Sequence, residues 1–294
     1  MPETREFAKP FRVEDGGKFR LRDVDPGETG GLKSRKEAQS WLEAGVARLS
    51  EMQEILYAQD QWAVLLIFQG MDAAGKDSAI KHVMSGINPQ GCQVYSFQTP
   101  SVEELNHDFL WRTSRDLPER GRVGIFNRSY YEEVLIVRVH PDLLAKERIP
   151  PSLVTKEIWK ERFQDIRAFE RYLTRNGTVV RKFFLHASKR EQKRRFLERL
   201  DQPEKNWKLS ASDVKERERW GDYSRAYEEM IQATAAPHAP WYVVPVDHKW
   251  FTRLVVASAI TDTLGELDLA LPKLDAERRK ELRAAREYLK SESH

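Results

Sequence analysis

Residues 62–78, WAVLLIFQGMDAAGKDS, decide the fold that the sequence predicts. Residues 64–68 form an unbroken apolar run of strand length, which is typical of a strand covered on both faces in a parallel sheet. GMDAAGK follows at once, with Gly70 and Gly75 flanking four residues and Lys76 directly after them. This spacing predicts a phosphate-binding loop that opens a helix, although an ordinary glycine-rich turn would have the same pattern. The residues expected around the phosphate are Gly70, Met71, Ala73, Ala74, Gly75, Lys76 and Asp77.

Two carboxylates accompany this loop. Asp77 takes the place after the lysine where a hydroxyl residue usually reaches Mg²⁺, and Asp72 lies inside the loop. Carboxylates repel phosphate oxygens unless a divalent cation lies between them, so the two acids predict bound Mg²⁺. For Asp77 alone, a favourable interaction with the helix N-terminus is an equally good explanation.

Composition limits the possible classes of protein. Of the 294 residues, 32% are charged and 40% hydrophobic, which is typical of a soluble globular protein. No apolar run approaches membrane-spanning length and the N-terminus does not resemble a signal peptide, so we expect a cytoplasmic protein without a membrane partner. The single cysteine, Cys92, excludes an internal disulfide. The seven histidines lack the close spacing of a zinc site, and the net charge of +3 does not indicate a nucleic-acid partner.

Strand and helix patterns alternate along the chain. Strands are predicted at residues 64–68, 94–97, 122–126, 178–185 and 241–246, and helices at residues 34–57, 77–85, 102–115, 152–175, 188–200, 213–233 and 250–264. This order predicts one three-layer α/β domain with a parallel sheet and helices on both faces. The predicted organisation is an extended N-terminal arm at residues 1–33, the phosphate-loop domain at residues 34–270 and a charged C-terminal helix within residues 271–294.

Polar residues follow the third predicted strand. Residues 127–133, NRSYYEE, come directly after an apolar stretch, and ligands of open α/β sheets are bound at the carboxyl ends of strands. Arg128 is a candidate clamp on a transferring phosphoryl group, and Glu132 is a candidate metal ligand or base. Arg138 is either a further site residue or a structural ion-pair partner.

Residues 181–208 carry ten Lys or Arg and four Asp or Glu, a local charge of +6 on a chain that is otherwise slightly acidic. A basic segment that follows a strand of a phosphate-loop domain predicts a helical lid over phosphates, at about residues 188–212. The alternative is an ordinary packing helix, because Phe196 and Leu200 share an apolar face and Glu191 is spaced to pair with Arg195.

A phosphate loop, acids suited to Mg²⁺, an arginine at a strand end and a basic lid together predict phosphoryl transfer. The residues alone indicate a kinase that acts on a small phosphorylated acceptor, with its donor undefined. An ATP-dependent nucleoside monophosphate kinase and a non-catalytic module that binds polyanions are the alternatives.

Several longer motifs make the chain resemble one family. GMDAAGKD at residues 70–77, NPQG at 88–91, LWR at 110–112, FNRSYYE at 126–132, KFFLHASKREQKRR at 182–195 and APWYVVPVDHKWFTR at 239–253 are similar to the polyphosphate kinase 2 family. The resemblance implies a P-loop kinase fold and reversible, Mg²⁺-dependent phosphate transfer between inorganic polyphosphate and adenine or guanine nucleotides. It also implies a homo-oligomer, as a dimer or tetramer.

The same resemblance assigns site residues. Asp72, Lys76, Arg128 and Glu132 are expected to be catalytic, and Asp72, Asp77 and Glu132 to hold the metal. Asn127 and Glu132 stand where many relatives have aspartate and asparagine, an exchange that resembles the branch that phosphorylates both AMP and ADP. The phosphate loop is expected to hold the nucleotide's phosphates. The residues expected to line the polyphosphate path are Lys182, Arg190, Lys193 and Arg194.

Overall fold

The computed structural model describes residues 7–292 and contains one six-stranded sheet with the order β1-β6-β5-β2-β4-β3. Strands β2 to β6 are parallel, and β1 pairs antiparallel with β6 at one edge. The predicted buried strand is β2, and every one of its residues is buried. The strands are β1 (Arg12–Val13), β2 (Ala63–Gln69), β3 (Cys92–Ser96), β4 (Val123–Asn127), β5 (Thr178–His186) and β6 (Trp241–Pro245).

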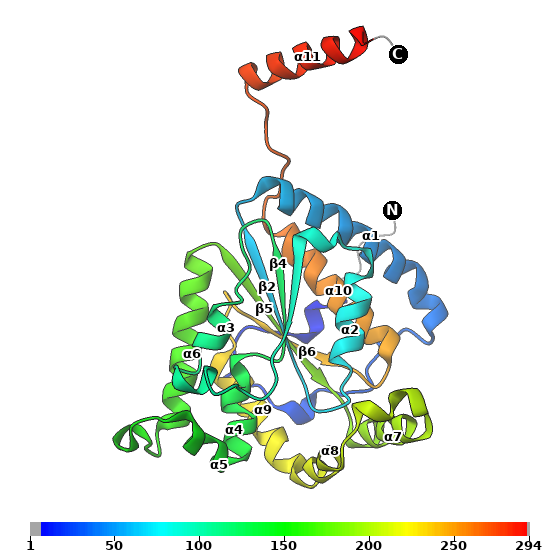
Figure 1. Ribbon diagram of the computed structural model, residues 1–294. Coiled ribbons are helices and arrows are strands. Elements are labelled where there is room, and N and C mark those ends of the chain that lie inside the picture. The colour runs from blue at the N-terminus through cyan, green and yellow to red at the C-terminus, as the bar shows by residue number, and fades with distance from the viewer. Residues whose placement is uncertain (1–6, 293–294) are drawn as a thin grey trace.

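Helices cover both faces of this sheet, as Figure 1 shows. Helices α1, α2 and α10 lie on one face, and α6 and α9 lie on the other. The three-layer α/β fold expected from the sequence is therefore confirmed. The longer helices are α1 (Arg35–Gln59), α2 (Lys76–Val83), α6 (Ile158–Arg175), α7 (Lys189–Asp201), α9 (Trp220–Thr234), α10 (Lys249–Gly265) and α11 (Ala276–Ser291). Shorter ones are α3 (Trp111–Ser114), α4 (Ile136–Val139), α5 (Pro141–Leu144) and α8 (Ala211–Glu216).

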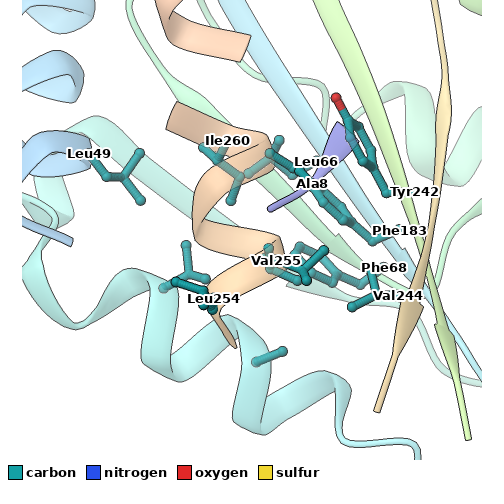
Figure 2. Close-up of a cluster of buried hydrophobic side chains, with 14 of the residues drawn as sticks. Ala8, Leu49, Leu66, Phe68, Phe183, Tyr242, Val244, Leu254, Val255 and Ile260 are labelled. Carbon is teal, nitrogen blue, oxygen red and sulfur yellow. The ribbon is translucent and has the colours of Figure 1, made fainter. Parts of the chain in front are cut away.

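Alternation along β2 divides the hydrophobic core into two layers. Leu66 and Phe68 face α10, whereas Leu65 and Ile67 face the opposite layer. Figure 2 shows the first layer, in which Val255 of α10 lies close to the side chains of the sheet. Burial on both faces keeps β2 at the centre of the sheet, and the loop that follows it is thereby fixed at the sheet's carboxyl edge.

Several predicted boundaries are confirmed by helix caps. The Ser34 side chain accepts a hydrogen bond from the Glu37 N–H at the start of α1, and the Ser188 side chain accepts one from the Glu191 N–H at the start of α7. Gly177, expected as a helix stop, has φ +78° just after α6.

The prediction of a helix at residues 102–115 is wrong. Ser101 and Glu104 do form the reciprocal hydrogen bonds of a capping box, but only one 3₁₀ turn, Glu104–Asn106, follows them. The Asp108 side chain then accepts a hydrogen bond from the Leu110 N–H and leads into α3. A side chain that bonds the backbone locally competes with the helix, so the chain turns instead of continuing.

Two further expectations need correction. The helix predicted from residue 152 begins at Ile158, after a 3₁₀ turn at Pro151–Leu153. The sheet has a sixth strand that the sequence did not indicate, because β1 is only two residues long. Within residues 7–33, Phe7, Phe11 and Leu21 are buried against the rest of the chain.

At the other end, every residue of α11 is exposed, and the helix stands away from the main body in Figure 1. Within residues 7–292, none of the helices combines the length and the apolar character needed to cross a membrane.

Candidate active site

The loop between β2 and α2 has the backbone shape of an anion site. Ala73 has φ +60° and Gly75 has φ +102°, and both values lie in the left-handed region. A side chain on Gly70 would lie only 3.0 Å from the Leu185 carbonyl oxygen, which explains the first glycine. Lys76 begins α2, and its Nζ donates a hydrogen bond to the Gly70 carbonyl at 2.5 Å. The loop and the helix N-terminus together form the arrangement that binds phosphate.

The second motif lies beside this loop. Strands β2 and β4 are parallel neighbours, so the residues that follow them lie at the same edge of the sheet. Arg128, with φ +67°, directs its Nη2 to Asp72 Oδ1 at 3.2 Å. The Asn127 Nδ2 donates to Asp77 Oδ1 at 2.7 Å. The structure therefore brings together two motifs that are about fifty residues apart in the sequence.

Glu132 faces this group from the 3₁₀ helix Tyr130–Val134. Gln69 is fully buried at the end of β2. In the amide orientation that satisfies both of its polar groups, its oxygen accepts hydrogen bonds from Ser129 and its Nε2 donates to Glu132 Oε1 at 2.8 Å. Burial raises the pKa of Glu132, and the neighbouring Arg128 and Lys76 oppose the increase. Burial, followed by repulsion from Arg128, lowers the pKa of Lys76. The site is thus a compact set of opposed charges, in which Arg128 and Asp72 still expose about a third of their side chains.

Two pockets meet at these residues. The smaller one, of about 60 Å³, lies between the phosphate loop and the segments α7 to α9. The larger one, of about 290 Å³, combines apolar side chains such as Phe97, Phe109 and Ile136 with charged and polar ones. Arg128, Glu132 and Ile136 line both pockets. A phosphate-sized space therefore shares a wall with a space large enough for a small organic molecule.

The carboxylates suit a metal that is shared with a ligand. Among residues 7–292, no group of three or more His, Cys, Asp or Glu is arranged to hold a metal ion. Mg²⁺ usually takes only one or two protein carboxylates and completes its shell with phosphate oxygens and water. Asp72 on the phosphate loop and Asp77 in the first turn of α2 fit that mode of binding.

Comparison with known proteins identifies the family. Residues 32–270 match the model of polyphosphate kinase 2 (PPK2), and this span is most of the chain. The chain belongs to the polyphosphate kinase 2 family. It is therefore an enzyme of that family, and its phosphate loop is that of a P-loop kinase fold.

Relatives of known name support this assignment. An ADP-polyphosphate phosphotransferase of Rhodopseudomonas palustris is 53% identical, over 96% of this chain and 98% of its own. An AMP/ADP-polyphosphate phosphotransferase of Meiothermus ruber is 42% identical, over 90% of this chain and 96% of its own. The crystal structure of polyphosphate kinase 2 from Arthrobacter aurescens TC1 superimposes with a TM-score of 0.86 at 39% identity, covering 96% of this chain and 98% of that one.

Lys182 of this polyphosphate kinase 2 does not lie where the sequence placed it. Its side chain is fully buried, and its Nζ donates to Glu170 Oε2 at 2.7 Å, to the Thr234 carbonyl at 2.8 Å and to the Tyr131 hydroxyl at 3.1 Å. Both faces of β5 are buried, so a basic residue inside this strand points into a protein layer. Its assignment to the polyphosphate path is therefore corrected to a structural role behind the site.

The other predicted lid residues lie on α7. Arg190, Lys193 and Arg194 are exposed. Arg194 is held by Glu191 at 2.6 Å and by Glu198 at 3.3 Å. Arg138, which the sequence left open, forms an ion pair with Glu229.

Two further residues belong to the surroundings of the pockets, and sequence reasoning missed the first of them, Gln69. Gln69 is the one polar residue of an otherwise apolar strand and directly precedes the phosphate loop, which is a signal visible in the sequence. Arg112 lines the larger pocket, where its Nη2 donates to the Gln98 carbonyl at 2.7 Å. The sequence allowed Trp111 and Arg112 to lie over a nucleotide base, although it placed them on a long helix, and Arg112 stands instead on the short helix α3.

Proposed function

We propose that the enzyme transfers phosphate reversibly from inorganic polyphosphate to nucleotides, converting AMP to ADP and ADP to ATP with Mg²⁺. The observation that carries the proposal is the meeting of the two pockets at Arg128 and Glu132. Phosphoryl transfer requires donor and acceptor oxygens in line on either side of one phosphorus atom. Two spaces with a common wall meet that requirement. The names of the two relatives, which give ADP and AMP/ADP as substrates, support the choice of nucleotide.

The two pockets suit different ligands. A polyphosphate chain has no base or sugar and needs a narrow path with hydrogen-bond donors, which the phosphate loop and the lid side of the smaller pocket offer. A nucleoside needs apolar surface, which the larger pocket supplies through Phe97 and Phe109. We therefore assign polyphosphate to the phosphate loop and the acceptor nucleotide to the larger pocket. This reverses our expectation that the loop holds the nucleotide's phosphates.

The charges have separate tasks in this arrangement. Lys76 and the loop N–H groups bind the donor phosphate, and Arg128 neutralises charge on the transferring group. Glu132, fixed by Gln69, faces the acceptor from the shared wall, and Asp72 orients Arg128. Asp72, Asp77 and Glu132 are the candidates to hold Mg²⁺, which would supply further neutralisation of phosphate charge when bound.

Nucleotide product analysis tests the proposal. Purified enzyme, Mg²⁺ and long-chain polyphosphate are mixed with AMP or with ADP in separate reactions that contain no ATP. We expect ADP and then ATP from AMP. Product from ADP alone would contradict the assignment to the branch that uses both nucleotides.

An ATP-dependent nucleoside monophosphate kinase is the competing function. It predicts no product with polyphosphate and full activity when ATP replaces it. Asp77, in the place of the usual hydroxyl residue, disfavours this alternative.

A further inference from the structure

Arg195 of α7 contacts the phosphate loop from behind. Its Nη1 donates to the carbonyl oxygens of Ala73 at 2.9 Å and Ala74 at 2.7 Å, and its Nη2 donates to the carbonyl of Val246. Its Nε donates to Glu191 Oε1 at 2.8 Å. The guanidinium is buried and does not line the smaller pocket. Its contacts are therefore with the loop's backbone and not with the space where phosphate would bind.

The loop needs partners on this side. A phosphate loop turns its N–H groups toward the anion, and its carbonyls then point outward into the protein. Ala73 and Ala74 are both buried, so their outward carbonyls would be costly if left without a donor. Ala73 also has φ +60°, a conformation that disfavours any residue with a side chain by about 1–2 kcal/mol. Arg195 holds the two adjacent carbonyls with Nη1, and the rest of its rigid fork of donors is fixed by Val246 and Glu191.

A second side chain of α7 makes a parallel contact. The Gln192 Nε2 donates to the Asp72 carbonyl at 2.9 Å, and Arg217 fixes the Gln192 Oε1 with a hydrogen bond of 2.6 Å. Residues 192 and 195 are three apart and so lie on one face of the helix. Side chains of α7 thus donate hydrogen bonds to three consecutive loop carbonyls, from Asp72 to Ala74.

We propose that Arg195, together with Gln192, is a positioning residue that clamps the phosphate loop in its anion-binding shape and connects it to α7. The enzyme's use of polyphosphate, as proposed above, is the function that this clamp serves. Because the clamp acts on the loop's backbone, its loss should weaken use of the loop's ligand and leave the acceptor pocket unaffected.

Arg195→Met tests the clamp, with Arg199→Met as the matched control. Arg199 lies one turn further along α7 and donates to the Lys208 carbonyl at 3.0 Å. Its replacement by methionine removes the same charge as the replacement of Arg195. Glu191 keeps its ion pair with Arg194 in the Arg195 variant, so no carboxylate is left without a partner. We expect Arg195→Met to lower kcat/KM for polyphosphate by about 100-fold, the scale of a misplaced reactant, and to leave the KM for the nucleotide within about twofold.

Amide hydrogen exchange gives a readout that does not depend on activity. Without any ligand, we expect residues 70–76 to exchange faster in Arg195→Met than in the wild type or in Arg199→Met. Arg195→Lys keeps the charge but not the fork, so we expect intermediate exchange and a loss of about tenfold in kcat/KM for polyphosphate. If the methionine variant does not fold, the lysine variant decides the matter by the same two measurements.

Wild-type loop exchange and a wild-type kcat/KM for polyphosphate in the Arg195 variants would overturn the proposal. Equal losses in the Arg195 and Arg199 variants would also overturn it, because charge and not the clamp would then be responsible. If the wild type transfers no phosphate from polyphosphate, the proposed function fails, yet the exchange experiment still decides whether Arg195 shapes the loop.

Discussion

Glu133 provides a stability prediction with a defined pH dependence. It lies in the wall of the larger pocket with a second acid, Glu147, and both carboxylates face one guanidinium, that of Arg162. All three side chains are almost entirely buried. Burial, together with the nearby charge of Glu147, raises the pKa of Glu133 from 4.5 to about 8. The folded protein therefore holds one proton on the pair of Glu133 and Glu147 at neutral pH, whereas the unfolded chain releases it.

The direction of the effect follows from this difference. Between pH 4.5 and about pH 8, the unfolded chain has one proton fewer than the folded protein, so each increase in pH favours unfolding. One pH unit in this range corresponds to about 1.4 kcal/mol, so a rise from about pH 5.5 to about pH 7.5 costs the wild type about 2–3 kcal/mol through Glu133. Glu133→Gln resembles the protonated acid and does not titrate, so it avoids this loss.

Urea unfolding of the wild type and Glu133→Gln at both pH values measures the effect. We expect the free energy of unfolding of the variant to exceed that of the wild type by about 2–3 kcal/mol more at about pH 7.5 than at about pH 5.5. Comparing the two proteins cancels the groups that they share. Glu103→Gln, at an exposed position, is the control and should show no such difference. Parallel stability curves for wild type and Glu133→Gln would refute the reasoning.

Three further predictions concern the site and its support. Lys76→Met should lower kcat at least about 100-fold and leave the circular dichroism spectrum unchanged, since the lost charge acts on the transferring phosphate; near-normal turnover would remove Lys76 from the catalytic set. Lys182→Met should destabilise the fold by about 3–5 kcal/mol in urea unfolding, because the buried carboxylate of Glu170 loses its partner, and adding Glu170→Gln should recover part of that loss. Asn127→Asp would replace the amide that donates to Asp77 at 2.7 Å with a like charge. We expect its melting temperature to fall in EDTA and to recover with Mg²⁺; equal melting temperatures in both buffers would contradict a metal at this position.

The local motifs were predictable because their signals lie in adjacent residues. One short stretch of sequence contains the apolar run of β2, the glycines of the loop and Lys76. Each of these residue types meets a local structural need: burial, a left-handed backbone conformation or a positive charge. The parallel arrangement of the sheet followed from the alternation of strand and helix patterns, since parallel strands need helical crossovers. The carboxyl ends of parallel strands lie at one edge of the sheet, so the approach of Arg128 to the loop could be inferred from its place after β4.

Other features depended on competing interactions whose relative strengths cannot be read from the sequence. The capping box at Ser101 forms as its residues suggest, but the Asp108 side chain redirects the chain one turn later. Lys182 belongs to a strongly basic stretch, yet the two-residue period of a doubly buried strand turns its side chain away from the site. Counting charge along the chain cannot distinguish a residue on a lid from one in the strand before it.

The contacts that shape the loop were the hardest to foresee, because they come from residues about 120 positions away in the sequence. The loop motif specifies which backbone conformation is possible, and glycine and alanine permit several others. Gln192 and Arg195 bind the carbonyls that such a loop must turn outward, so they select one conformation among those that the motif allows. The proposed clamp makes function depend on the inner face of α7 as well as on the loop. Substitutions on that face should impair the use of polyphosphate even when the loop sequence is intact.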